Sequence, residues 1–62
     1  MKFRMFTDAD SGLKTALDID SVSRIEEEPS GGTLISLKDM DRLLPVREDF
    51  QTVFSRLNTI AE

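Results

Sequence analysis

The sequence predicts an α+β fold, a four- to five-stranded, mostly antiparallel β-meander packed against one C-terminal amphipathic helix. Two observations lead to this fold class. Up to position 46, apolar and polar residues alternate in short segments separated by turn residues, which is the pattern of strands. Beyond that position the apolar spacing changes to three and four residues, as on one face of a helix. We expect residues 1–62 to form a single domain, because so short a chain has room for one core.

The first two predicted strands, residues 2–7 and 13–19, would form a hairpin because apolar residues alternate in both. The polar segment 8–12 between them contains Asp and Gly residues, which tolerate turn geometry. Within the first strand, Phe6 falls on the face opposite Phe3. The alternation therefore places one aromatic residue on each face of the predicted strand.

The segment from residue 20 to residue 28 permits two interpretations. Val22 and Ile25 are three residues apart, which suggests one helical turn. The acidic run that follows favours an edge strand over residues 23–28, because charge on a strand edge hinders pairing with other chains. Both alternatives stay open at the level of the sequence.

The strongest turn signal is Pro-Ser-Gly-Gly at residues 29–32, where Pro fixes one backbone angle and Gly accepts positive φ. Strands are predicted on its C-terminal side at residues 33–38 and 42–46. Pro45 cannot donate a backbone hydrogen bond. We therefore expect the last strand to lie at an edge, or to pair through its carbonyl group at that position.

The C-terminal helix is predicted over residues 48–61. Its apolar face would comprise Phe50, Val53, Phe54, Leu57 and Ile60. Glu48 and Asp49 lie near the predicted start, where exposed amides and the helix dipole favour negative charge.

The same periodicity predicts which side chains face the helix. The helix-facing set comprises Phe3, Met5, Leu17, Ile19, Ile35, Leu37, Leu44 and Val46. Four apolar residues then fall on the opposite face of the sheet, namely Phe6, Ala16, Leu34 and Leu43. A single helix leaves that face open, and a contiguous apolar patch there would mark a protein interface, with a dimer as the favoured assembly. The alternative is that the four residues are scattered and individually exposed, or are covered by the N-terminal residues.

The composition argues against catalysis and metal binding. The chain contains neither Cys nor His, which removes disulfides and the thiolate and imidazole ligands of zinc. No base is available to activate a serine, and no acidic residue shows a sign of burial. We expect no enzyme activity, no cofactor, no bound metal and no membrane insertion. The default compartment is the cytoplasm, because a signal peptide is not apparent.

Three local motifs resemble ligand sites, but each fits a structural role better. Segment 8–12 begins like a calcium loop, yet Gly12 comes one position early and Ile19 stands where the bidentate Glu belongs. The turn at residues 29–32 is rich in Gly, but no Lys-Ser or Lys-Thr pair follows it. The acidic run 26–28 is expected to be a solvated strand edge.

The charge distribution bears on nucleic-acid binding. The net charge is −4, and all of the acidic excess lies in residues 26–62, which argues against DNA or RNA as the main partner. A nucleic-acid-binding regulatory module is the alternative function. Its contacts would be Lys2, Arg4 and Lys14 on the outward face of the N-terminal hairpin, with Phe6 as a stacking residue.

The stretch from Leu17 to Leu57 reads LDIDSVSRIEEEP, then GGTLISLKD, then LPVREDFQTVFSRL. In length and in its order of turn, hairpin and terminal helix it resembles the flagellar FlbD-like (SwrD-like) family of small bacterial proteins. It also resembles the first part of the LytTR-type DNA-binding domain of response regulators. The first resemblance implies a non-enzymatic bacterial accessory protein, and the second implies DNA contact. The sequence thus favours a small binding module that acts through protein–protein contacts.

Overall fold

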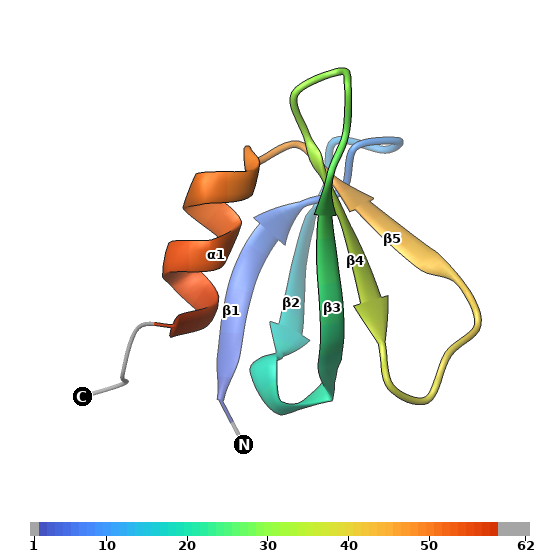
Figure 1. Cartoon of the computed structure of the whole chain (residues 1–62), viewed down its shortest axis with the longest axis vertical. Helices are drawn as coiled ribbons and strands as arrows, with labels where there is room; N and C mark the ends of the chain where they lie inside the picture. Colours follow the sequence, from blue (N-terminus) through green and yellow to red (C-terminus); the bar gives the residue numbers. More distant parts are fainter. Residues whose placement is uncertain (1, 59–62) are drawn as a thin grey trace.

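A computed structural model describes residues 2–58 of the chain (Figure 1). Within these residues the elements are β1 (Phe3–Thr7), β2 (Lys14–Asp18), the 3₁₀-helix η1 (Ile19–Ser21), β3 (Val22–Glu27), β4 (Thr33–Leu37), β5 (Leu43–Val46) and α1 (Phe50–Asn58). Every strand pairing among them is antiparallel, and the helix follows the strands. The predicted α+β fold class is therefore confirmed. Ile60 and the predicted helix end at residue 61 lie outside the described residues.

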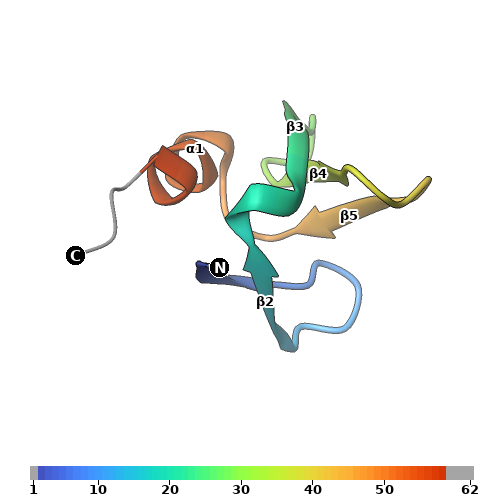
Figure 2. The ribbon, with the colours of Figure 1, turned by 90° about the horizontal axis from the view of Figure 1, so that it is seen from below.

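The five strands of this part of the chain form two sheets, because η1 turns the backbone between β2 and β3. One sheet pairs β1 with β2, and the other has the order β3-β4-β5. Figure 2 shows β2 on one side of the molecule and β3 and β4 on the other, with α1 beside them. The strand interpretation is confirmed by β3, whereas the helical turn suggested by Val22 and Ile25 is wrong, because both residues lie in that strand. A 3₁₀ turn occurs earlier, at Ile19–Ser21, and leads directly into β3.

One end of β5 joins the two sheets. Val46 forms an isolated bridge with Asp8. The amide of Ala9 donates to the carbonyl of Pro45 at 2.9 Å, and the amide of Arg47 donates to the carbonyl of Thr7 at 2.8 Å. Pro45 therefore takes part through its carbonyl group, and β5 is an edge strand of the three-stranded sheet, so both arrangements predicted for the last strand are present.

The turn between β3 and β4 depends on glycine at two positions. Gly31 has a φ of +106°, in the region that favours glycine. A Cβ atom on Gly32 would lie 2.5 Å from the carbonyl oxygen of Val46 in β5. The turn closes with the Gly31 amide donating to the Glu28 carbonyl at 2.9 Å. The predicted turn is confirmed, and it packs directly against β5.

Helix α1 begins at Phe50 rather than at residue 48, because Asp49 is its N-cap. The Asp49 carboxylate accepts a hydrogen bond from the Thr52 amide at 2.8 Å. Hydrogen bonds from the side chain and the amide of Thr52 lower the pKa of Asp49. On the predicted apolar face Val53 is fully buried, whereas Phe54 is 49% exposed and stacks on Phe50. The helix thus contributes a narrower stripe to the core than its sequence suggests.

The core is formed by residues from both sheets and from the helix. Its buried apolar members are Phe6, Leu17, Ile35, Val46 and Val53. The predicted inward orientation of Leu17, Ile35 and Val46 is confirmed, and the predicted residues Leu37 and Leu44 pack half-buried against this cluster.

The face assignment of the first strand is wrong. Phe6 is fully buried, whereas Phe3 and Met5 are 54% and 60% exposed. The cause is the hairpin register, because Asp8 pairs with Leu13 through a 2.9 Å backbone hydrogen bond and only four residues form the loop. The predicted loop 8–12 is one residue longer, and a shift of one residue turns every side chain of a strand to the other face.

Candidate functional site

The four residues predicted to form one interface do not lie together. Phe6 is in the core, and Ala16 is exposed on the β1–β2 hairpin. Leu34 and Leu43 lie diagonally to each other on the outer face of the three-stranded sheet, where Leu34 is half-buried opposite Pro45 and Leu43 is 48% exposed. The predicted patch is therefore divided between two sheets, and Phe6 is removed from it.

The outer side of the β1–β2 hairpin carries a different apolar surface. Residues directly paired across antiparallel strands point to the same face. The face opposite the core, which we call the hairpin face, comprises the pairs Phe3 with Asp18, Met5 with Ala16, and Thr7 with Lys14. Sequence reasoning placed Phe3 and Met5 inside and so missed this surface. The signal that could have found it is the loop length, since a four-residue loop places Leu17 opposite Arg4.

A hollow of about 490 Å³ adjoins the hairpin face at Met5 and Lys14. It is lined by Arg4, Met5, Lys14, Glu48 and Arg56. Two of the predicted nucleic-acid contacts, Arg4 and Lys14, line this hollow, but the prediction that they share the outward face is wrong, because the register places Arg4 on the face of Leu17. The predicted stacking residue Phe6 is buried and cannot contact a base. Arg56 is a third cation in the lining and was missed because it comes from the helix. Lys2 is exposed and is not part of this lining, and its carbonyl accepts a hydrogen bond from the Ile19 amide at 2.9 Å.

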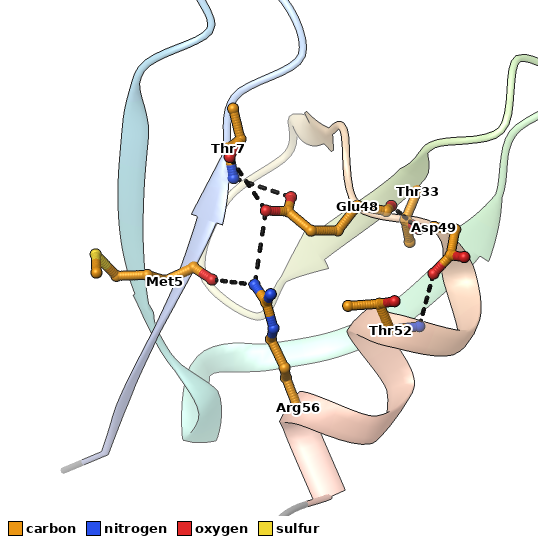
Figure 3. A network of polar contacts seen from close by, with 7 residues as sticks. All are labelled: Met5, Thr7, Thr33, Glu48, Asp49, Thr52 and Arg56. Carbon is orange, nitrogen blue, oxygen red and sulfur yellow. Dashed lines mark hydrogen bonds and ion pairs between the residues drawn. The ribbon is translucent and has the colours of Figure 1, made fainter.

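The edge of β1 that faces away from β2 is covered by charged side chains from the C-terminal segment (Figure 3). The amide and the hydroxyl of Thr7 donate to the Glu48 carboxylate at 2.9 and 3.1 Å. Arg56 donates to the Met5 carbonyl at 2.7 Å and lies 3.6 Å from the Glu48 carboxylate. These two side chains take the place of a further strand, and charge at such an edge discourages pairing with another chain.

Glu48 is a largely buried carboxylate, with 15% of its side chain exposed. Burial alone would raise the pKa of Glu48, but hydrogen bonds from Thr7 and from its own backbone, together with the charge of Arg56, lower the pKa below its usual value. Its carbonyl also accepts a hydrogen bond from the Thr33 hydroxyl at 2.9 Å. A carboxylate held ionised in this way fits an architectural role better than proton transfer.

The loop that begins like a calcium site is held by its own hydrogen bonds. The Asp8 carboxylate accepts from the Asp10 amide, and the Asp8 carbonyl accepts from the Gly12 amide, both at 2.9 Å. Gly12 has a φ of +78°, which favours glycine at that position. In residues 2–58 no group of three or more metal-ligating side chains is placed to hold an ion. Over the same span, no helix has the length and apolarity needed to cross a bilayer.

Comparisons of the chain with protein-family models, with curated proteins and with solved structures give no match. The FlbD-like and LytTR-type resemblances therefore stay predictions. Any proposal on function depends on the hairpin face and on the hollow beside it.

Proposed function

We propose that the chain is a small, non-enzymatic, cytoplasmic bacterial binding module that acts through protein–protein contacts of the hairpin face. The exposure of Phe3 and Met5, 54% and 60%, beside the exposed Ala16 is the observation that carries this proposal. Each square ångström of apolar surface removed from water stabilises a complex by about 25 cal/mol before the costs of association. Adjacent large apolar side chains on a surface therefore favour a contact site.

The chemistry of the neighbouring hollow supports binding over catalysis. Glu48 is the carboxylate in its lining, and its oxygens accept hydrogen bonds from Thr7 and face Arg56. A general acid needs a proton to donate, and the lowered pKa of Glu48 keeps this group ionised at neutral pH.

The test is affinity capture with matched baits. Wild-type protein, Met5→Lys and Leu13→Lys are each immobilised and exposed to extract of the source cells. Leu13 is 69% exposed but precedes β2, so its variant controls for the added charge. We expect wild type and Leu13→Lys to retain the same protein, which can itself be a second copy of the chain. Met5→Lys should retain roughly tenfold less of that protein. Equal retention by Met5→Lys, or retention of no protein by wild type, would contradict the proposal.

A nucleic-acid-binding regulatory module is the second candidate. One observation favours it, namely that Arg4 and Lys14 line the same hollow as Arg56. The net charge of −4 and the presence of Glu48 in that lining place it second. It predicts salt-sensitive binding of oligonucleotides that is lost when Lys2, Arg4 and Lys14 are all replaced by Glu. No binding at low ionic strength would exclude it.

A further inference from the structure

We infer that the hairpin face is self-complementary and seats the hairpin face of a second copy about a two-fold axis through the Met5–Ala16 pair. The inference rests on the proposed function, because it names the partner of the same surface. It follows from the order in which the register places charged and apolar side chains.

Three cross-strand pairs form successive rows of the hairpin face. Asp18 lies beside Phe3 at one end, Ala16 beside Met5 in the middle, and Lys14 beside Thr7 at the other end. Same-face residues along a strand are roughly 7 Å apart. Along β2 the surface thus changes from negative through apolar to positive, with the apolar residue in the middle.

A two-fold axis that lies in this face and runs perpendicular to the strands reverses the strand direction. It keeps β2 over β2, so Ala16 meets Ala16 of the second copy, and Met5 meets Met5. Lys14 of each copy then lies opposite Asp18 of the other. An isologous interface makes every contact twice, and the result is an apolar centre flanked by two ion pairs.

The other two-fold arrangement of the same face is less favourable. An axis along the strands would place β1 over β2, with Lys14 opposite Thr7 and Asp18 opposite Phe3 of the second copy. Lys14 would then lie near Glu48, which is hydrogen-bonded to Thr7, but Asp18 would be covered by Phe3 without an ionic partner, and desolvating an unpaired charge is costly. The charge order therefore selects the perpendicular axis.

Both charged groups can take part in such contacts. Lys14 is exposed. The Asp18 carboxylate accepts a 3.1 Å hydrogen bond from the Asp20 amide through one oxygen, and a carboxylate has further acceptor sites for an ammonium group. A polyanion such as nucleic acid would be repelled by Asp18 on this face. A second copy of the chain instead places its Lys14 opposite Asp18, where the two charges attract. The face is small, so we expect a weak dimer with a Kd on the order of 10 to 1000 μM.

The test exchanges the charges. Lys14→Asp places Asp opposite Asp, and Asp18→Lys places Lys opposite Lys, so each variant alone should dimerise at least roughly tenfold more weakly than wild type. Mixed in equal amounts, the two variants present opposite charges at both positions. We expect the mixture to form a heterodimer with a Kd within about threefold of the wild-type value, measured by sedimentation equilibrium.

Asp18 is the N-cap of η1, so Asp18→Lys also removes a helix cap, and a second measurement protects the test against misfolding. The chain contains no Cys, so Ala16→Cys carries the protein's sole thiol. At the axis it should be cross-linked between copies by a short bismaleimide at least roughly tenfold more than Leu43→Cys, which is exposed on the other sheet.

Three results would overturn the inference, namely a wild-type protein that stays monomeric at millimolar concentration, a mixture of charge variants that does not associate, or equal cross-linking of the two Cys variants. Retention of a different protein by the wild-type bait, lost with Met5→Lys, would then leave the proposed function standing without the dimer.

Discussion

At the scale of single residues, Glu48 joins three parts of the chain that are distant in sequence. Its carboxylate accepts hydrogen bonds from Thr7 in β1 and lies near Arg56 in α1, and its carbonyl accepts from Thr33 in β4. Hydrogen bonds to a charged group contribute more than those between neutral groups. One ionised side chain thus ties the hairpin to the helix.

Replacing Glu48 by Gln should destabilise the protein by about 1–2 kcal/mol near neutral pH, because charge-assisted hydrogen bonds are lost. The folded-state pKa of Glu48 lies below its unfolded value, so its stabilisation is present above the unfolded pKa of about 4.3 and is lost as the pH falls through the folded pKa. Urea unfolding of wild type and variant should therefore differ near pH 7 and converge near pH 2. Glu27→Gln, at an exposed position, is the control and should match wild type at both values.

Gly32→Ala should destabilise the protein by about 1–3 kcal/mol, because the added Cβ would lie 2.5 Å from the Val46 carbonyl oxygen and backbone must move. Ser30→Ala, at an exposed position of the same turn, should change stability by less than about 0.5 kcal/mol. Thermal or urea unfolding of both variants provides the comparison. Equal stability of the two would mean that β5 does not approach the turn so closely.

At the scale of elements, the register of the β1–β2 hairpin decides which face of β1 enters the core. Both faces of β1 carry Phe, so hydrophobicity alone leaves the choice open. Phe6 lies near the junction with β5 and under the Arg56 guanidinium, which is 5.6 Å from its ring centroid. Phe3 lies at the far end of the strand, beside Asp18.

The orientation of β1 is tested by one substitution made at both Phe positions. Phe6→Leu removes volume from the core and should cost about 1–2 kcal/mol in unfolding free energy. Phe3→Leu, at a position that is 54% exposed, should cost less than about 0.5 kcal/mol. If urea unfolding showed a larger loss of stability for Phe3→Leu than for Phe6→Leu, Phe3 and not Phe6 would be the residue of β1 that packs in the core.

The start of α1 depends on Asp49, and Asp49→Ala should loosen the first turn of the helix. The Thr52 amide would lose its acceptor, so its hydrogen exchange should become faster while amides of β4 are unaffected. Asp49→Asn keeps an acceptor oxygen and should preserve most of the protection. Unchanged exchange at Thr52 in the Ala variant would argue against the cap.

At the scale of the whole molecule, the sequence predicts elements better than their assembly. The strand from Thr33 to Leu37 and the turn that precedes it were predictable, because period-two alternation and glycine chemistry are local signals. The split into two sheets and the bridge from Asp8 to Val46 depend on contacts between distant segments. The same holds for the candidate surface: alternation alone predicts an outward Ala16, whereas the outward side chains of Phe3 and Met5 depend on the register of the hairpin.

A chain cut after Arg47 should fail to fold, because it lacks the core residue Val53 and both side chains that cover the edge of β1. We expect collapsed amide dispersion in NMR spectra and concentration-dependent light scattering, since an open edge pairs with other copies. Adding the peptide of residues 48–58 should reduce the scattering. A truncated chain with native-like spectra would show that the helix is not required for the fold.

The covering of β1 also determines when the protein can finish folding during its synthesis. The contacts from Thr7 to Glu48 and from Met5 to Arg56 join residues 41 and 51 positions apart, almost the length of the described chain. Closing such long loops costs entropy before the contacts can form, which slows folding. Because β1 precedes α1 along the chain, β1 leaves the ribosome before the helix that completes its edge, so a nascent chain carries an open strand edge until α1 has emerged.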